Sequence, residues 1–190
     1  NLQDSKVGQM RCSFLLKNYE TAIEGANKVL LIEKIPAELS TEAHMTIAKS
    51  AMEKQDYDLA AKEFGIISAN SQNERSAEAK YNIANIQYIK AQYKESQKTL
   101  FELINQKPSY GNWVGKAFLL LSDNYVALGD MFNAKFALKT VIDKSTNNET
   151  VEQAKAKLAV IVEKEKADEE QKKKLAEEKN KPMPVDETDI

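Results

Sequence analysis

The chain has 190 residues, of which 42% are hydrophobic and 29% are charged, and its 27 basic and 29 acidic residues give a formal net charge of −2. Basic and acidic residues are mixed along the whole chain, which argues against nucleic-acid binding, because phosphate binders gather Lys and Arg on one face. No apolar run approaches the roughly 18 residues of a membrane span, so we expect no direct membrane insertion. Only 6 Gly and 4 Pro occur, and Ala, Lys, Glu and Leu are frequent, which favours helices.

The chain begins at Asn1 rather than Met and contains a single cysteine, Cys12. We therefore interpret it as a fragment or processed form that has lost its natural N-terminus and any signal peptide on it. One cysteine allows no internal disulfide, but many exported proteins also lack disulfides, so the redox compartment stays open. The localisation is unknown on these grounds.

Four short segments, around Tyr19, Tyr57, Tyr93 and Met131, share a polar stretch, a large side chain and a small residue three positions later. The large residues recur at intervals of 36 to 38 positions. Apolar residues at helical spacing flank the segments, which are too short for anything but the turn of an antiparallel helix hairpin. The sequence therefore predicts an all-α fold with about four hairpins, over residues 3–35, 40–70, 75–107 and 112–145.

Helix-start signals precede the predicted helices. Ser40 and Thr41 stand before the second hairpin. Ser71, with Glu74 three residues later, has the pattern of a capping box before the third hairpin. Asn147 and Asn148 are candidate caps for one more helix, which is predicted to begin at about residue 149.

This last helix carries an apolar stripe, which consists of Val151, Ala154, Leu158, Ile161 and Val162. We expect it to cover the exposed end of the fourth hairpin, because terminal repeats need a capping element. Charges of alternating sign follow, and their i, i+4 spacing supports a helix. Pro182 and Pro184 end any helix, and 182–190 is predicted to be disordered. We therefore divide the chain into a helical-repeat domain, 1–165, and a charged helical extension with a disordered tail, 166–190.

The run Phe118-x2-Leu121-Ser122-x2-Tyr125, followed by Ala134-x3-Leu138, resembles the tetratricopeptide repeat signature, Trp-x2-Leu-Gly-x2-Tyr followed by Ala-x3-Phe. Ala60-x3-Phe64 is similar, and Pro108 stands where the family has its closing Pro. The resemblance covers about residues 5–146, with a period two to four residues longer than the usual one. More loosely, the layout resembles the C-terminal part of large bacterial cell-envelope proteins with such repeats, which leans the localisation toward the periplasm or envelope.

The resemblance implies a right-handed α-α superhelix whose first helices line a concave groove. The residues expected to face this groove are Arg11, Met45, Lys49, Met52, Tyr81, Asn85, Tyr88, Leu119, Asp123 and Val126. For any one of them, an ordinary surface or packing role is an equal alternative. Arg11, Lys49 and Asn85 occupy equivalent places on successive first helices, where charge-assisted hydrogen bonds would hold a carboxylate. Asp123 would repel such a ligand.

No catalytic, cofactor-binding or metal-binding set is predicted. His44 and Cys12 are the only residues of their kinds, so an ordinary zinc site cannot be assembled. We interpret His44 as a packing residue and Cys12 as a small core residue. The run Gly111-x-x-x-Gly115-Lys116 lacks the spacing and the preceding strand of a phosphate-binding loop, so we interpret it as a helix-opening turn, with Trp113 as a packing anchor.

The sequence therefore predicts a scaffold rather than an enzyme, which binds a peptide or protein partner in the groove and needs no cofactor. Structural self-assembly is the alternative, either as a homo-oligomer or by stacking on further repeats of a longer chain. Its motivation is the weak first repeat, in which Gln9 stands where the pattern requires an apolar residue. Such a repeat would leave an open stacking edge.

Overall fold

The structure, a computed structural model, describes residues 2–70 and 73–179. The described residues form nine helices and no strand, so the all-α prediction is confirmed for them. The helices are α1 (Leu2–Leu15), α2 (Tyr19–Leu30), α3 (Ala37–Glu53), α4 (Tyr57–Asn70), α5 (Glu74–Ile89), α6 (Tyr93–Ile104), α7 (Gly111–Ala127), α8 (Met131–Lys144) and α9 (Asn148–Lys179).

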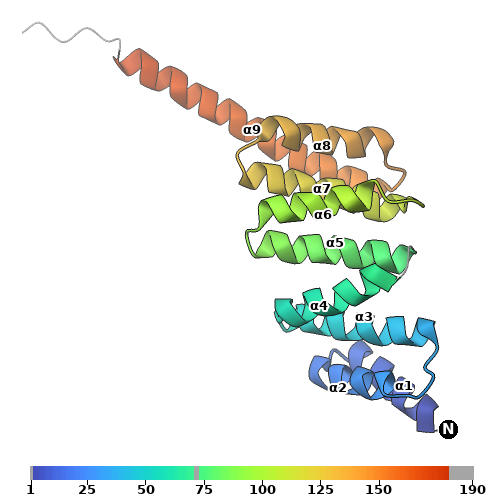
Figure 1. Cartoon of the computed structure of the whole chain (residues 1–190). Coiled ribbons are helices and arrows are strands. Elements are labelled where there is room, and N and C mark those ends of the chain that lie inside the picture. The colour runs from blue at the N-terminus through green and yellow to red at the C-terminus, as the bar shows by residue number, and fades with distance from the viewer. Residues whose placement is uncertain (1, 71–72, 180–190) are drawn as a thin grey trace, which may run out of the picture.

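The helices are stacked one after another, from α1 at one end to α9 at the other (Figure 1). Each helix packs against its neighbours in the chain. Further contacts join α1 to α3, α5 to α7, and α7 to α9, whereas within 2–70 and 73–179 no two of α2, α4, α6 and α8 touch. Among the described residues, the backbones of α3 and α5 do not touch, but the ion pair between Lys49 and Glu78 joins these two helices as well. The odd-numbered helices thus form one side of the stack. We call the part made by α1, α3, α5 and α7 the first-helix face.

The turns between paired helices are alike. Lys17, Gln55, Ala91 and Gly129 have positive φ values of 60°, 61°, 57° and 78°. In each turn the next residue donates its N–H to the carbonyl five residues earlier, for example Asn18 to Ser13 and Asp130 to Tyr125, both at 2.9 Å. This is a helix end closed by one left-handed residue. Four equivalent turns at intervals of 36 to 38 residues match the repeated segments of the sequence.

The core holds small residues where neighbouring helices cross. Ala48, Ala60, Ala84 and Ala134 are fully buried, beside large side chains such as Phe64 and Leu138. At the position equivalent to Ala60, the third repeat has Ser96, whose hydroxyl donates to the Ala84 carbonyl at 2.8 Å. Small side chains let the helices approach closely, and the one polar substitute is satisfied by a hydrogen bond.

Two predicted helix starts need correction. The helix assigned to begin after Ser40 and Thr41 begins earlier, at Ala37. Pro36 has the extended backbone that precedes a helix, and because proline has no N–H it leaves no donor without a partner there. Ser71 lies outside the described residues, and the cap of α5 is Asn73, whose side chain accepts the Ser76 N–H at 3.0 Å.

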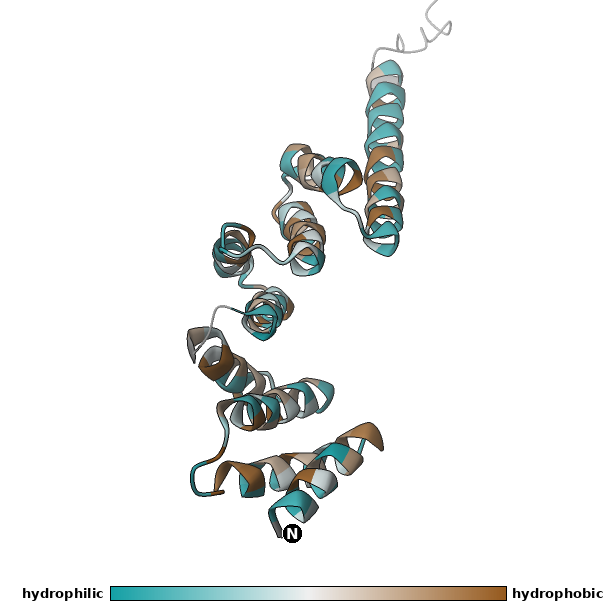
Figure 2. Ribbon diagram, turned by 90° about the vertical axis from the view of Figure 1, so that its right-hand side faces the viewer, coloured by the Kyte–Doolittle hydropathy of each residue, from teal (hydrophilic) through white to brown (hydrophobic). Residues whose placement is uncertain are grey.

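Of the two candidate caps of the last helix, Asn147 is confirmed. It directly precedes α9, and its Oδ1 accepts the Thr150 N–H at 3.1 Å. The first half of α9 packs on α7 and α8 through the buried Ala154 and Ile161. Its second half projects away from the stack and is mostly hydrophilic (Figure 1 and Figure 2). The segment 182–190, predicted to be disordered, lies outside the described residues.

Candidate partner-binding surface

Several predicted groove residues line two adjoining hollows at the α1 and α3 end of the first-helix face. The first, which we call the α1–α3 hollow, has a volume of about 380 Å³. Its lining consists of Arg11, Phe14, Leu15, Glu42, Met45, Thr46, Lys49, Arg75 and Glu78. The second hollow, of about 420 Å³, shares Phe14, Leu15 and Lys49 with the first and adds Met52. The structure thus brings Arg11, Met45, Lys49 and Met52 together on one surface.

The apolar part of this surface comes mostly from side chains that the sequence analysis did not select. Leu15 is 79% exposed at the end of α1 and lines both hollows. Phe14 is half-buried beside it, and Met45 is nearly covered. An exposed apolar residue next to a hollow is typical of a binding surface. The adjacent pair Leu15 and Leu16 at a helix end was the available signal, and the weak apolar pattern of the first repeat hid it.

Ion pairs join consecutive first helices across this surface. Arg11 donates to both carboxylate oxygens of Glu42, at 2.5 and 2.7 Å, and Lys49 Nζ lies 2.6 Å from Glu78 Oε1. Glu42 and Glu78 occupy equivalent places in α3 and α5. The hydrogen bond from Arg11 holds the pKa of Glu42 below its usual value. The two cations expected to hold a ligand carboxylate therefore already neutralise carboxylates of the chain itself.

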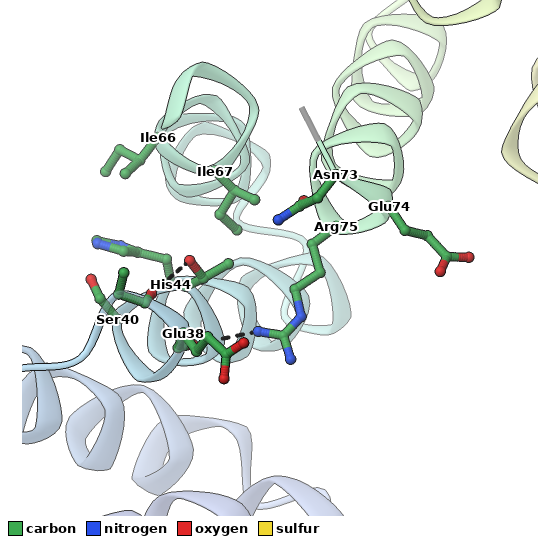
Figure 3. A pocket seen from close by; sticks show the side chains of 10 residues that line it. Glu38, Ser40, His44, Ile66, Ile67, Asn73, Glu74 and Arg75 are labelled. Atoms are coloured by element: carbon green, nitrogen blue, oxygen red, sulfur yellow. Dashed lines mark hydrogen bonds between the residues drawn. The ribbon is translucent and has the colours of Figure 1, made fainter. Parts of the chain in front are cut away.

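Of the cations that line the α1–α3 hollow, Arg11, Lys49 and Arg75, only Arg75 forms no ion pair within the described residues. Its guanidinium donates only to the Glu38 carbonyl, at 3.4 Å, and no carboxylate among the described residues lies within ion-pair distance of it. It lines the α1–α3 hollow, a neighbouring one with Arg11 and Glu38, and a third one with His44. Figure 3 shows Arg75 reaching from the start of α5 toward Glu38. Its charge helps to lower the pKa of Glu42, but its guanidinium is not held by a carboxylate and can pair with one from a ligand.

The histidine is engaged within the chain. His44 Nδ1 lies 2.6 Å from Glu63 Oε2, and Glu63 is only 6% exposed. The pair joins α3 to α4 beside the hollow of Figure 3, where Ile66 and Ile67 form the apolar wall. His44 thus has a polar partner, which its interpretation as a packing residue did not include. A buried carboxylate needs such a partner.

On α5 the predicted residues Tyr81, Asn85 and Tyr88 are all half-buried. Burial raises the pKa of both tyrosines, and the nearby charge of Asp123 adds to the rise. The Tyr81 ring also packs on Trp113 with the ring centres 5.6 Å apart, so Trp113 is the packing residue that we expected. Tyr81, Tyr88 and Asp123 therefore lie close together where α5 meets α7.

On α7 the predicted groove residues are covered. Leu119 is 6% exposed and lies in a core cluster with Ala134, Ala154 and Ile161, which corrects its assignment to the groove. Val126 is partly buried against the same cluster. Asp123 is paired with Lys157 of α9, at 2.5 Å. The reason is that α9 packs on α7 and occupies the space that a ligand would need.

Cys12 is a second correction. It is exposed, not a core residue. In the part of the chain that the structure describes, no group of three or more His, Cys, Asp and Glu side chains is arranged to hold a metal ion. Over the same residues, no helix combines the length and the apolar character that crossing a membrane requires.

A scan against protein-family models and a search of curated proteins give no match for this chain.

Proposed function

We propose that this chain is a tetratricopeptide-like scaffold that binds a peptide or protein partner along the first-helix face and catalyses no reaction. The observation that carries the proposal is the pair of adjoining hollows, with exposed Leu15 at their shared edge and charged side chains around them. Apolar surface with a polar rim is typical of interaction sites. In the proposal the stack is a right-handed superhelix, and this face is its concave side.

The side chains of the surface suit an extended or helical peptide. Met45 and Met52 adapt to different ligand shapes, because methionine has three flexible torsions and a polarizable sulfur. Tyr81 and Tyr88 offer large contact area with few torsions to immobilise. The ion pairs of Arg11 and Lys49 hold α1, α3 and α5 in register beneath the ligand. Binding would thus use a largely preformed surface.

Selection of peptides from a random display library against the full chain tests this proposal. We expect selected peptides to lose about tenfold or more in affinity for the Leu15→Ser/Met52→Ala variant, because both side chains contribute apolar contact area. The Tyr81→Ala/Tyr88→Ala variant should also bind more weakly. Circular dichroism of each variant checks that the fold is retained.

The matched control is Phe132→Ser, which removes a side chain of α8 that is 78% exposed and lies outside the hollows. Its affinity should equal that of the parent. Peptides that bind the first-helix variants as tightly as the parent, but bind Phe132→Ser more weakly, would overturn the proposed surface. Failure to select any peptide would count against the scaffold.

Self-assembly is the second candidate, and exposed leucines at the α1–α2 end favour it. Leu16 and Leu31 are 66% and 84% exposed, in addition to Leu15. A further repeat or a second copy would cover them. Sedimentation velocity over a wide concentration range tests this candidate, because a monomer at every concentration is incompatible with self-assembly.

A further inference from the structure

The last residues of the sequence have a composition that complements the α1–α3 hollow. The segment 180–190 reads Asn-Lys-Pro-Met-Pro-Val-Asp-Glu-Thr-Asp-Ile. Met183 and Val185 are apolar, Asp186 and Glu187 follow at once, and Asp189 adds a third carboxylate. Such a segment presents apolar side chains directly beside negative charges.

The hollow offers the matching chemistry in the same arrangement. Phe14, Leu15 and Met45 supply its apolar surface, and Arg75 stands at its edge with no carboxylate partner. Arg11 and Lys49 add positive charge, which Glu42 and Glu78 balance. The three cations of the hollow thus exceed its two carboxylates by one charge, and Arg75 is the cation without an ion pair. A ligand carboxylate would form a charge-assisted pair with its guanidinium.

Within one molecule, the segment 180–190, which we call the tail, follows a helix that leads away from this hollow. The ion pair between Lys135 and Glu165 ties α9 to α8, and from there α9 continues to Lys179, which adds about 21 Å at the helical rise. Figure 1 shows this part projecting at the end of the stack opposite to α1. The segment 180–190, fully extended, spans at most about 40 Å.

A length of about 40 Å is too short for this segment to bind the α1–α3 hollow of its own molecule. About half of that length is needed to return alongside the projecting part of α9. The rest is needed to pass α7 and α5, since packed helices lie about 8–10 Å apart. A second copy has no such restriction.

We propose that residues 183–190 of one copy bind the α1–α3 hollow of another copy, with the apolar side chains on Phe14 and Leu15 and a carboxylate on Arg75. This inference rests on the proposed function of the first-helix face and names its partner. The contact is head-to-tail, so it joins copies into closed rings, of which a reciprocal dimer is the smallest, or into open chains. The charged second half of α9 acts as the arm that presents the tail, since Asp168, Glu169 and Glu170 each precede a lysine by four positions, which supports the helix.

A labelled peptide with the sequence of residues 180–190 tests the contact directly by fluorescence anisotropy with the full chain. We expect saturable binding that weakens about tenfold or more in the Arg75→Gln variant, because a charge-assisted hydrogen bond is lost. A peptide with Asp186→Asn, Glu187→Gln and Asp189→Asn should bind the parent as weakly. It should lose nothing further with Arg75→Gln, since both changes remove one pairing.

The matched control is Lys98→Gln, which removes one exposed positive charge on α6, outside the hollow. It should bind the labelled peptide like the parent. Equal binding of the charged and the amide peptides, or binding unaffected by Arg75→Gln, would overturn the inference.

Sedimentation of the full chain and of a variant that ends at Lys179 tests whether the contact joins copies. We expect concentration-dependent association of the full chain and its loss in the shortened variant. A full chain that stays monomeric, while the peptide binds the shortened variant alone, would place the tail in its own hollow and contradict the intermolecular contact. If peptides selected from the library bind the hollow but the tail peptide does not, this inference fails and the proposed function stands; if neither binds, both fail.

Discussion

The two ends of the first-helix face differ in what covers them. Along α1, α3 and α5 the face carries open hollows, whereas along α7 the helix α9 lies across it and buries Leu119. The two ends also differ in the sign of the charge that the first helix contributes to its ion pair. Arg11 of α1 and Lys49 of α3 are cations that pair with carboxylates of α3 and α5. Asp123 of α7 is an anion that pairs with Lys157 of α9.

This difference shows that equivalent repeat positions do not have equivalent surroundings. Lys49, Asn85 and Asp123 occupy the same place in successive first helices and are all half-buried. Lys49 nevertheless lines the open hollows, whereas Asp123 meets a cation from the terminal helix. Which part of the first-helix face is open for binding therefore depends on the terminal helix α9, which packs on α7. The open end near α1 is therefore the part of the molecule suited to a ligand.

The largest effect is expected where α9 covers α7. Leu119→Ala should lower the free energy of unfolding by about 2–5 kcal/mol, because the substitution leaves a cavity in the core cluster with Ala134 and Ile161. Urea unfolding measures it. The matched control is Leu128→Ala, at a residue that is 43% exposed, which should cost much less. Equal costs would mean that α9 does not seal this end and that the contrast between the two ends is wrong.

A smaller effect, alike at both ends, is expected at the crossings of paired helices. Ala60→Leu and Ala134→Leu should each cost about 1–3 kcal/mol, because the larger side chain has no space at a fully buried site. Ala156→Leu, at an exposed position of α9, is the control and should leave the thermal midpoint nearly unchanged. Parent-like melting of both core variants would contradict the repeat register.

The smallest effect concerns the ion pairs of the open end. The pKa of Glu42 is lower in the folded chain than in the unfolded one, because Arg11 donates hydrogen bonds to its carboxylate. Its stabilisation is therefore complete above the unfolded pKa and is lost as the pH falls through the folded value. Glu42→Gln should cost about 0.2–1 kcal/mol at pH 7, since the pair is partly exposed.

At about pH 3 the difference between Glu42→Gln and the parent should shrink, because the parent carboxylate is then increasingly protonated. Denaturant unfolding at both pH values measures it. Glu102→Gln, at an exposed position of α6, controls for the general effect of removing a carboxylate. If the free-energy cost of Glu42→Gln does not change with pH, the ion pair is not its cause.

Local patterns were sufficient for the helices and their turns. A hairpin turn depends on a few consecutive residues, so the segments around Tyr19, Tyr57 and Tyr93 marked the turns correctly. The buried alanines followed from the same periodicity, because a residue that recurs at each helix crossing must be small. The start of α3 was misplaced because Ser40 and Thr41 are good caps in isolation, while Pro36 stands ahead of them.

The sequence by itself thus determined an all-α chain, the positions of its turns and the small residues of its core, since each depends on contacts within a repeat or on its period. Only the tertiary structure decided that Cys12 is exposed, that Leu119 is covered by α9 and that Arg11 and Lys49 are paired while Arg75 is not. These properties depend on side chains about 30 or more residues apart meeting across helices. No spacing within one helix specifies which partner will be there.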